Sequence, residues 1–398
     1  MELNKTELLF KRFDELACAN FCTVLTLVDQ IDALRLEGAF HSCIANQLYP
    51  ELTLNKRPLS QPPHVFFQSL SESQSIDDVL KEEVLDVSHP LTVFYQGNRL
   101  AVVFQHHISD GRSSMVFLNQ VLLHYYGLTE PNDCVSAHDT PVSSKYHSRF
   151  KLFHLSVWVV MYFFRYFLSG ISRFPDVYDR RAKRKNLFVH SMNLTVDDNQ
   201  FLADQCMNEG VSYTAKLAAK YMLAIKKYLY HGRNETLAIL VAVDMKRRRM
   251  NVLRCDTSFL LIKHRFSALL NESIEATFHR KIQQGLANEY PIALFQVFPP
   301  KAVLSKTMVK LYMMFQQPAY MLTNYGNLNA YISETVEEKI DALYSFVPPS
   351  LNTVFTLTTY TFKGVMCSST AGYGSRVSPK IIEKAHSELV NTLRSQSS

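Results

Sequence analysis

The sequence predicts a mixed α/β protein made of two domains of similar size. The chain has 398 residues, about two to three times the length of a typical single domain. Segments with helix and strand patterns occur in both halves of the chain. Hydrophobic residues form 47% of the chain and charged residues 20%, which is the composition of a folded protein with a large core. We expect a first domain at 1–175, ending in an apolar and basic connecting segment at 150–185, and a second domain at 186–398.

The first half alternates strand and helix patterns. Gln96-Gly97-Asn98 separates two strand-like runs and favours a hairpin turn. Gly127 follows a run with the apolar spacing of a buried helix and should end that helix. The expected elements are a strand at 24–30, a helix from about 31 to 48, strands at 91–95 and 99–104, and a helix at 113–126.

The second half repeats this mixture. Gly210-Val-Ser-Tyr-Thr separates two helical patterns and should cap the longer one, and Thr alternates with apolar residues near the end of the chain, as in a sheet strand. The expected elements are a strand from 187 to 194, helices at 197–208 and up to about 230, and strands at 237–244 and 353–362.

Composition excludes several classes of protein. The net charge of +6 is modest for this length, so we expect no nucleic-acid partner. The seven cysteines are scattered, odd in number and without a CxxC pair, which argues against a disulfide framework or a structural zinc site. The first sixteen residues carry charge throughout and lack the apolar run of a signal peptide. We therefore expect reduced, buried thiols and a cytoplasmic location.

The stretch 103–114 (VFQHHISDGRSS) lies between a predicted strand and a predicted helix. A loop of this kind places side chains on a rigid support beside a cleft. His106 and Asp110 are four residues apart and Gly111 follows, which gives the pattern HxxxDG. Two other interpretations of the same residues are a metal-binding pair and a purely structural polar turn. A metal pair would lack a third ligand spaced nearby, so we expect no metal.

This order of strand, HxxxDG motif and buried helix resembles the thioester-dependent acyltransferase superfamily. That group includes chloramphenicol acetyltransferase, nonribosomal-peptide condensation domains, alcohol acetyltransferases and wax-ester synthases. Three further stretches resemble parts of the same family, namely 20–48, 241–249 (VAVDMKRRR) and 322–326 (LTNYG). The resemblance implies two chloramphenicol-acetyltransferase-like domains, each a mixed sheet with flanking helices, and a tunnel between them. It also implies an acyl-CoA or acyl-carrier thioester as co-substrate, with no bound cofactor.

The resemblance assigns the catalytic base by register. Many relatives have two histidines and then three residues before Asp-Gly, and their second histidine is catalytic. Here the three-residue gap begins at His106, so His106 is the expected base and His107 a supporting neighbour. A neutral imidazole can take the proton of an alcohol or amine as it attacks a thioester carbonyl. Asp110 completes the catalytic motif by holding the loop in shape, and Gly111 is expected to let the loop turn tightly into the helix.

The resemblance also supplies partners for these residues. Asp110 should pair with an arginine from 246–249, but Lys246 occupies the family's usual arginine position, and lysine cannot make the planar two-point contact. Either Arg247 or Arg248 takes over, or the pair is weaker; the run could equally be a solvated basic strand end. Thr323 and Asn324 should lie across the cleft and place the substrate or polarise its carbonyl, unless they are ordinary turn residues.

The segment 152–168 is strongly apolar and aromatic, and 180–185 is basic. The uncharged run is short for a membrane-spanning helix, and a helix buried between the domains is the plain structural interpretation. We favour an interfacial helix, because Trp158, Tyr162 and Tyr166 suit the headgroup level and the basic end suits anionic lipid. The protein would then associate peripherally with a membrane and act on a hydrophobic or lipid-like acceptor.

The predicted function is therefore transfer of an acyl group from an acyl-CoA or acyl-carrier thioester to a hydroxyl or amine. One rival is a condensation-type enzyme that joins carrier-protein-bound intermediates in natural-product assembly. Another rival is an inactive relative that uses the cleft only to bind a lipid or a carrier protein.

Overall fold

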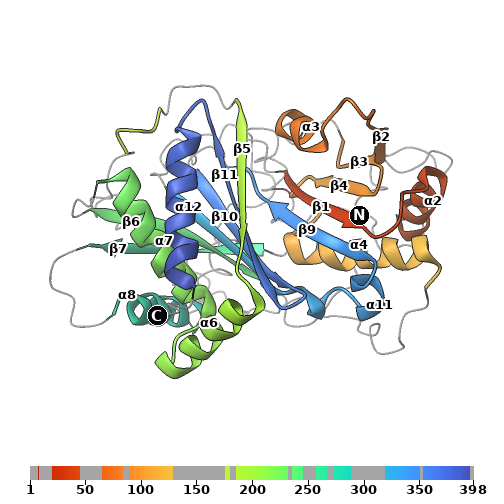
Figure 1. Cartoon of the computed structure of the whole chain (residues 1–398). Coiled ribbons are helices and arrows are strands. Elements are labelled where there is room, and N and C mark those ends of the chain that lie inside the picture. Colours follow the sequence, from red (N-terminus) through yellow and green to blue (C-terminus); the bar gives the residue numbers. More distant parts are fainter. Residues whose placement is uncertain are drawn as a thin grey trace, which may run out of the picture.

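The structure, a computed structural model, describes residues 8, 20–44, 65–83, 89–128, 175–179, 185–231, 235–244, 257–266, 273–287, 319–349 and 353–394. In this part of the chain, two mixed β-sheets stand next to each other and helices pack against both (Figure 1). The described helices include none that is both long enough and apolar enough to cross a bilayer.

The first sheet has five strands in the order β2-β3-β4-β1-β9 among the described residues. Its strands are β1 (Phe21–Leu27), β2 (Val65–Ser69), β3 (Leu91–Gln96), β4 (Arg99–Phe104) and β9 (Ile340–Phe346). β2 and β3 are parallel, and the other neighbours are antiparallel. The accompanying helices are α2 (Ala33–Cys43), α3 (Ile76–Glu83), α4 (Gly111–Tyr126), the 3-10 turn η4 (Leu328–Ala330) and α11 (Glu334–Glu337).

The second sheet has six strands in the order β5-β11-β10-β8-β6-β7 within the described ranges. Its strands are β5 (Leu187–Asn193), β6 (Thr236–Asp244), β7 (Thr257–Arg265), β8 (Ala319–Asn327), β10 (Thr353–Phe362) and β11 (Val365–Tyr373). β8 is parallel to both of its neighbours, β6 and β10, so this sheet is mixed as well. The helices α6 (Val196–Glu209), α7 (Tyr213–Leu229), α8 (Ile274–Ala287) and α12 (Pro379–Leu393) pack against it (Figure 1).

Strand β9 connects the two halves of the chain. It comes from the C-terminal part of the sequence but pairs antiparallel with β1, so Val24 lies between Ala101 on one side and Tyr344 on the other. The chain then continues into β10 of the second sheet (Figure 1). The predicted division into domains at 1–175 and 186–398 stays a prediction. Strand β9 belongs to the range 186–398 but completes the first sheet.

One hydrophobic core spans the two sheets. Phe104 and Phe117 from the first half belong to the same buried cluster as Tyr325, Tyr360 and Cys367 from the second sheet. Polar contacts reinforce this junction, because the Tyr360 hydroxyl donates to the Leu343 carbonyl of β9 at 2.8 Å. A rigid shared core of this kind can hold side chains from both sheets in fixed positions relative to one another.

The segments that the sequence predicts as strands or helices are strands or helices in the structure. The strand predicted at 24–30 is β1 and begins earlier, at Phe21, while the helix predicted from 31 is α2 and begins at Ala33 after Asp32 caps it. Gly127 ends α4 in the left-handed conformation, as predicted. Strand β11 and helix α12 were not predicted, and the apolar segment 152–168 with the basic run 180–185 lies outside the described residues.

The cysteines within the described ranges are free thiols. Cys22, Cys43, Cys206 and Cys367 are all buried. Burial raises the pKa of Cys43 to about 12 and that of Cys367 to about 11, so both thiols stay protonated near neutral pH.

Candidate active site

The HxxxDG loop is held in place from the end of β4. The backbone N–H of Gln105 donates to the Pro90 carbonyl at 3.0 Å, and its side-chain amide donates to the His89 carbonyl at 3.0 Å. Ile108 is buried in the shared core, which anchors the middle of the loop. Gln105 thus ties the loop to the segment before β3.

Asp110 caps helix α4. Its carboxylate accepts a hydrogen bond from the Ser113 backbone N–H at 2.8 Å and another from the Ser113 hydroxyl at 2.9 Å. Only 2% of Asp110 is exposed. An N-cap aspartate satisfies donors that the first helical turn leaves open. The expected arginine partners, Arg247 and Arg248, lie outside the described residues, so the predicted ion pair stays a prediction.

Gly111 is needed for a reason other than the expected tight turn. It is the first residue of α4, and its φ is not among the positive values found at other glycines. A Cβ placed on Gly111 would lie 2.1 Å from Cε1 of Tyr325, a residue of β8 in the second sheet. The missing side chain therefore lets the ring of Tyr325 pack directly against the start of α4.

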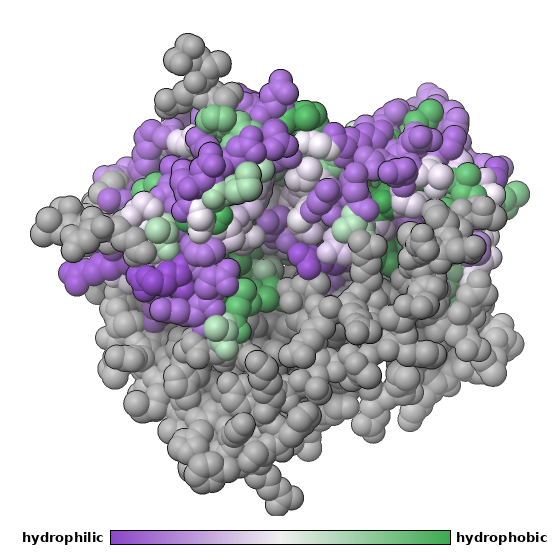
Figure 2. Space-filling view, turned by 90° about the horizontal axis from the view of Figure 1, so that it is seen from below, coloured by the Kyte–Doolittle hydropathy of each residue, from purple (hydrophilic) through white to green (hydrophobic). Residues whose placement is uncertain are grey.

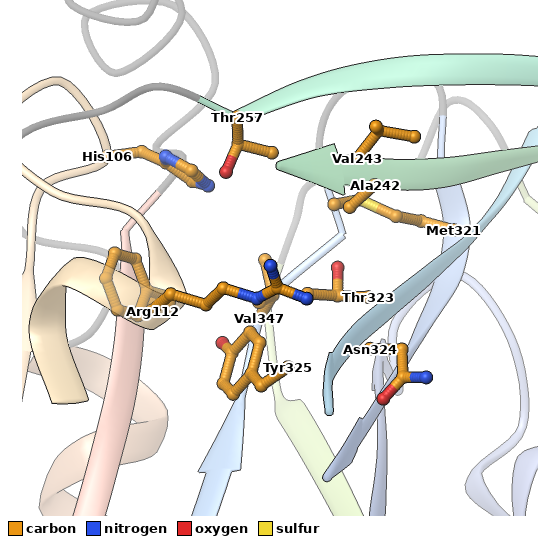
Figure 3. A pocket seen from close by; sticks show the side chains of 12 residues that line it. His106, Arg112, Ala242, Val243, Thr257, Met321, Thr323, Asn324, Tyr325 and Val347 are labelled. Atoms are coloured by element: carbon orange, nitrogen blue, oxygen red, sulfur yellow. The ribbon is translucent and has the colours of Figure 1, made fainter. Parts of the chain in front are cut away.

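His106 lines a pocket between the two sheets. Its ring meets the ring of Phe21 edge-on, with centroids 5.3 Å apart, and Phe21 in turn stacks on Phe104. His106 itself is 7% exposed, so almost all of its small accessible surface faces the pocket. The lining residues, drawn in Figure 3, are Phe21, His106, Gly111, Arg112, Ala242, Val243, Thr257, Met321, Thr323, Asn324, Tyr325 and Val347.

The two predicted motifs meet in this pocket. His106 and Gly111 come from the loop and helix that follow β4, whereas Thr323 and Asn324 come from β8 (Figure 3). His107, the neighbour of the expected base, is half-buried and is not one of the lining residues.

Thr323 and Asn324 differ in what their side chains do. Adjacent strand residues face opposite sides of a sheet. The Asn324 amide donates to the Thr214 hydroxyl at 3.1 Å, and its oxygen accepts from the Gly326 N–H at 2.9 Å. The Thr323 hydroxyl is buried and makes no hydrogen bond within the described part of the chain. The hydrogen bonds of Asn324 thus hold the end of β8 in position. Of the two residues, Thr323 is the one whose side chain can still form a hydrogen bond to a ligand.

Sequence reasoning did not single out Arg112 and Tyr325. Both lie next to motif residues, since Arg112 follows the Asp-Gly pair and Tyr325 is part of the LTNYG stretch. The Tyr325 hydroxyl is 3.4 Å from the Ser345 hydroxyl of β9. Burial raises the pKa of Tyr325 well above its ordinary value, so the phenol is neutral at physiological pH. Hydrophobic periodicity in the sequence could not have identified either residue as part of the pocket lining.

Within the described ranges, no three His, Cys, Asp or Glu side chains are grouped so as to hold a metal ion.

Comparisons with known proteins identify the fold. No protein-family model matches the chain, and no curated protein matches its sequence. Among solved structures, trichothecene 15-O-acetyltransferase from Fusarium sporotrichioides aligns with a TM-score of 0.73 at 11% identity, over 98% of this chain and 93% of that one. The two-sheet α/β fold expected from the sequence is therefore confirmed.

Two modules of peptide and polyketide synthases share the same fold. The condensation domain from monacolin K polyketide synthase aligns with a TM-score of 0.64 at 10% identity, over 98% of this chain and 95% of that one. The epimerization domain from tyrocidine synthetase B aligns with a TM-score of 0.64 at 13% identity, over 99% of this chain and 96% of that one. These similarities match the resemblance to the acyltransferase and condensation superfamily, and at such identities they establish the fold alone.

Proposed function

We propose that the protein transfers an acyl group from a thioester to a hydroxyl or amine acceptor. The single observation that carries this proposal is the position of His106, which lies in a pocket between the two sheets with Thr323 in the same lining. An imidazole and a buried hydroxyl without a hydrogen bond in the described structure, both in one pocket, are groups that acyl transfer needs.

His106 would act as the general base. Its neutral imidazole takes the proton from the acceptor O–H or N–H while the acceptor atom forms a bond to the thioester carbonyl carbon. The resulting tetrahedral intermediate then loses its C–S bond. The protonated imidazole returns the proton to the departing sulfur, which leaves an ester or amide and a free thiol. Proton, bond and charge balance without a covalent acyl-enzyme.

Thr323 would stabilise the charge that develops on the carbonyl oxygen. Its buried hydroxyl makes no hydrogen bond among the described residues and can therefore donate to an incoming oxyanion. Such a donor is most effective in a pocket that excludes water. Asn324 would contribute indirectly by fixing the end of β8 next to Thr323.

The remaining motif residues would support this chemistry. Asp110 holds the first turn of α4, and Gly111 admits the ring of Tyr325, so both keep the His106 loop in register with β8. We retain His107 as a neighbour of the base and Arg247 or Arg248 as the partner of Asp110.

The donor would be an acyl-CoA or an acyl-carrier thioester. Apolar side chains of Phe21, Val243, Met321 and Val347 line much of the pocket, which favours an acceptor or acyl chain with hydrophobic parts. A membrane surface as the source of such a substrate, and a cytoplasmic protein bound peripherally to it through 152–185, belong to the same proposal.

Thiol release tests the assignment of the base. Wild-type protein is incubated with acyl-CoA, acyl-pantetheine or acyl-carrier donors and a panel of alcohols and amines, and free thiol is measured. We expect His106→Gln to lower the rate of acceptor-dependent thiol release by about 10²–10⁴-fold. His107→Gln is the matched control and should retain activity. Equal rates in wild type and His106→Gln would rule out His106 as the base.

A condensation-type reaction is the second candidate, and the alignment with a condensation domain over nearly the whole chain favours it. The same assay separates the two. Turnover with a carrier-bound donor but not with the CoA or pantetheine thioester would identify the condensation reaction. Absence of turnover with every donor, together with binding of a thioether analogue, would identify an inactive binding relative.

A further inference from the structure

Thr257 contributes a second hydroxyl to the pocket that holds His106. It is the first residue of β7, it is half-buried, and it is one of the lining residues. Figure 3 shows its hydroxyl directed toward the His106 ring. The proposed acyl transfer assigns no role to this hydroxyl, although it faces the expected base.

The two threonine hydroxyls on the second sheet stand among apolar side chains. Thr257 and Thr323 share the pocket lining with Ala242, Val243 and Met321. The described surface in Figure 2, by contrast, is mostly hydrophilic, with hydrophobic residues in smaller patches. A polar group placed among apolar ones in a pocket serves to fix the orientation of a ligand. Thr257 is therefore a candidate contact for the substrate.

Strand register places the two threonines on the same face of the second sheet. Thr257 pairs with Asp244 of β6. Two residues before Asp244, Ala242 lies next to Thr323 in the register of β6 with β8. Residues that pair across strands, or that lie two apart in one strand, point to the same side of a sheet. From a strand spacing of about 4.8 Å and a rise of about 3.3 Å per residue, the Cα atoms of the two threonines are roughly 12 Å apart. A hydrogen bond spans only about 3 Å, so the two hydroxyls contact different groups of a substrate.

The proposed mechanism gives Thr323 the carbonyl oxygen, which leaves the acceptor to Thr257. The reacting atom of the acceptor must come within about 3.2 Å of a His106 nitrogen, and the Thr257 hydroxyl faces that ring. An alcohol oxygen gives its proton to the imidazole and one lone pair to the carbonyl carbon, and its second lone pair can accept from Thr257. A primary amine keeps a second N–H instead, which can donate to Thr257, because a threonine hydroxyl both donates and accepts.

We propose that Thr257 binds the reacting atom of the acceptor and holds it against His106. The inference rests on the proposed acyl transfer and narrows its acceptor class to alcohols and primary amines. Each of these keeps one hydrogen-bonding site after it has engaged His106 and the carbonyl carbon. A thiol meets this requirement poorly, because sulfur is a weak hydrogen-bond acceptor, and a secondary amine has no second N–H. Thr257 keeps its own proton throughout the reaction.

The test compares acceptors that differ at the reacting atom. Each alcohol is paired with the thiol of the same carbon skeleton, and each primary amine with its N-methyl derivative. The acylated product is measured by mass spectrometry, after subtraction of uncatalysed exchange, in wild type, Thr257→Val and Thr257→Ser. Valine removes the hydroxyl at nearly constant volume, and serine keeps it. Thr92→Val is the matched control, because Thr92 is also a half-buried strand threonine but lies on β3 outside the pocket lining.

We expect Thr257→Val to lower kcat/KM for the alcohol or primary amine by roughly 3- to 30-fold and to leave that of its thiol or N-methyl partner within about twofold. The ratio of the two values should therefore fall, while the KM of the thioester donor stays unchanged. Thr257→Ser and Thr92→Val should keep the wild-type ratio. A ratio measured within one preparation does not depend on the folded fraction, so poor folding of Thr257→Val cannot imitate the effect. If the second member of a pair is not acylated, the loss in Thr257→Val relative to Thr257→Ser, at equal denaturant midpoints, replaces the ratio.

The outcomes separate this inference from the proposed function. A ratio in Thr257→Val within about twofold of wild type, or an equal loss for both members of a pair, overturns the role of Thr257. If His106→Gln still abolishes transfer in the same assay, the proposed function stands without that role. Absence of His106-dependent transfer to every acceptor overturns both.

Discussion

Gly111→Ala tests how the two sheets are joined at the site. The new Cβ would lie 2.1 Å from Cε1 and 2.3 Å from Cζ of Tyr325. Carbon atoms pack favourably at about 3.5–4.0 Å, so the ring or the start of α4 would have to move by more than about 1 Å. Tyr325 is 3% exposed and stacks on Tyr360 with centroids 6.2 Å apart, which leaves the ring little room to move.

The expected loss of stability follows from this overlap. Forcing extra carbon into a packed core destabilises a protein by about 1–3 kcal/mol, and the short distance places Gly111→Ala toward the upper end. Gly38→Ala is the matched control, because no atom lies within 4 Å of a Cβ at that position in helix α2. That control should gain roughly 0.5–1 kcal/mol, as expected for Gly replaced by Ala inside a helix. Denaturant unfolding of both variants measures the difference.

A double-mutant cycle with Tyr325 makes the test specific. In a Tyr325→Ala background the ring is absent, and Gly111→Ala should be nearly neutral, which gives a coupling energy of about 2 kcal/mol. In a Tyr325→Phe background the ring remains and the full penalty should return. If Gly111→Ala behaved like Gly38→Ala, or lost the same stability with and without the ring, the argument from close approach would be refuted.

Two further predictions concern groups elsewhere in the chain. Burial lowers the pKa of His386 to about 3 and that of His264 to about 4, so the unfolded chain binds two protons that the folded chain excludes below about pH 6.5. The free energy of unfolding should therefore reach its full value above pH 6.5 and fall by about 1.4 kcal/mol per pH unit for each histidine as the pH drops toward 4. Urea unfolding at several pH values measures this slope. A slope in His386→Gln equal to that of wild type would contradict the prediction. Thr323→Val should leave the free energy of unfolding within about 1 kcal/mol of wild type, because the hydroxyl that it removes is buried without a partner in the described structure. It should nevertheless lower kcat for thiol release by roughly 10²–10³-fold. Full activity of a well-folded variant would exclude an oxyanion role for Thr323.

The agreement between sequence and structure is best where the cause is local. The Gln96-Gly97-Asn98 turn and the end of the helix at Gly127 each depend on residues within one turn of the chain. The short segments between such signals could therefore be assigned as strand or helix. Two strand-like runs with a turn between them led correctly to the hairpin of β3 and β4.

Elements whose position depends on distant partners were not predicted. The place of β9 in the first sheet requires pairing with β1, more than three hundred residues earlier in the chain. The role of Gly111 likewise depends on Tyr325, which is far away in sequence and close only in the folded chain. A pattern read along the chain carries no information on such contacts, so the expected reason for Gly111, a tight turn, was wrong.

Local periodicity in the sequence by itself determined the mixed α/β class and the loop between β4 and α4, whereas His106 as the expected base came from the resemblance of the HxxxDG motif to the acyltransferase family. Only the tertiary structure decided which side chains share a pocket with His106. Packing of the two sheets brings β8 against the start of α4, places Thr323 and Arg112 in one pocket lining, and leaves the Asn324 amide bonded to Thr214. The direction of side chains at an interface between sheets depends on strand register and core packing, and no short stretch of sequence determines either of them.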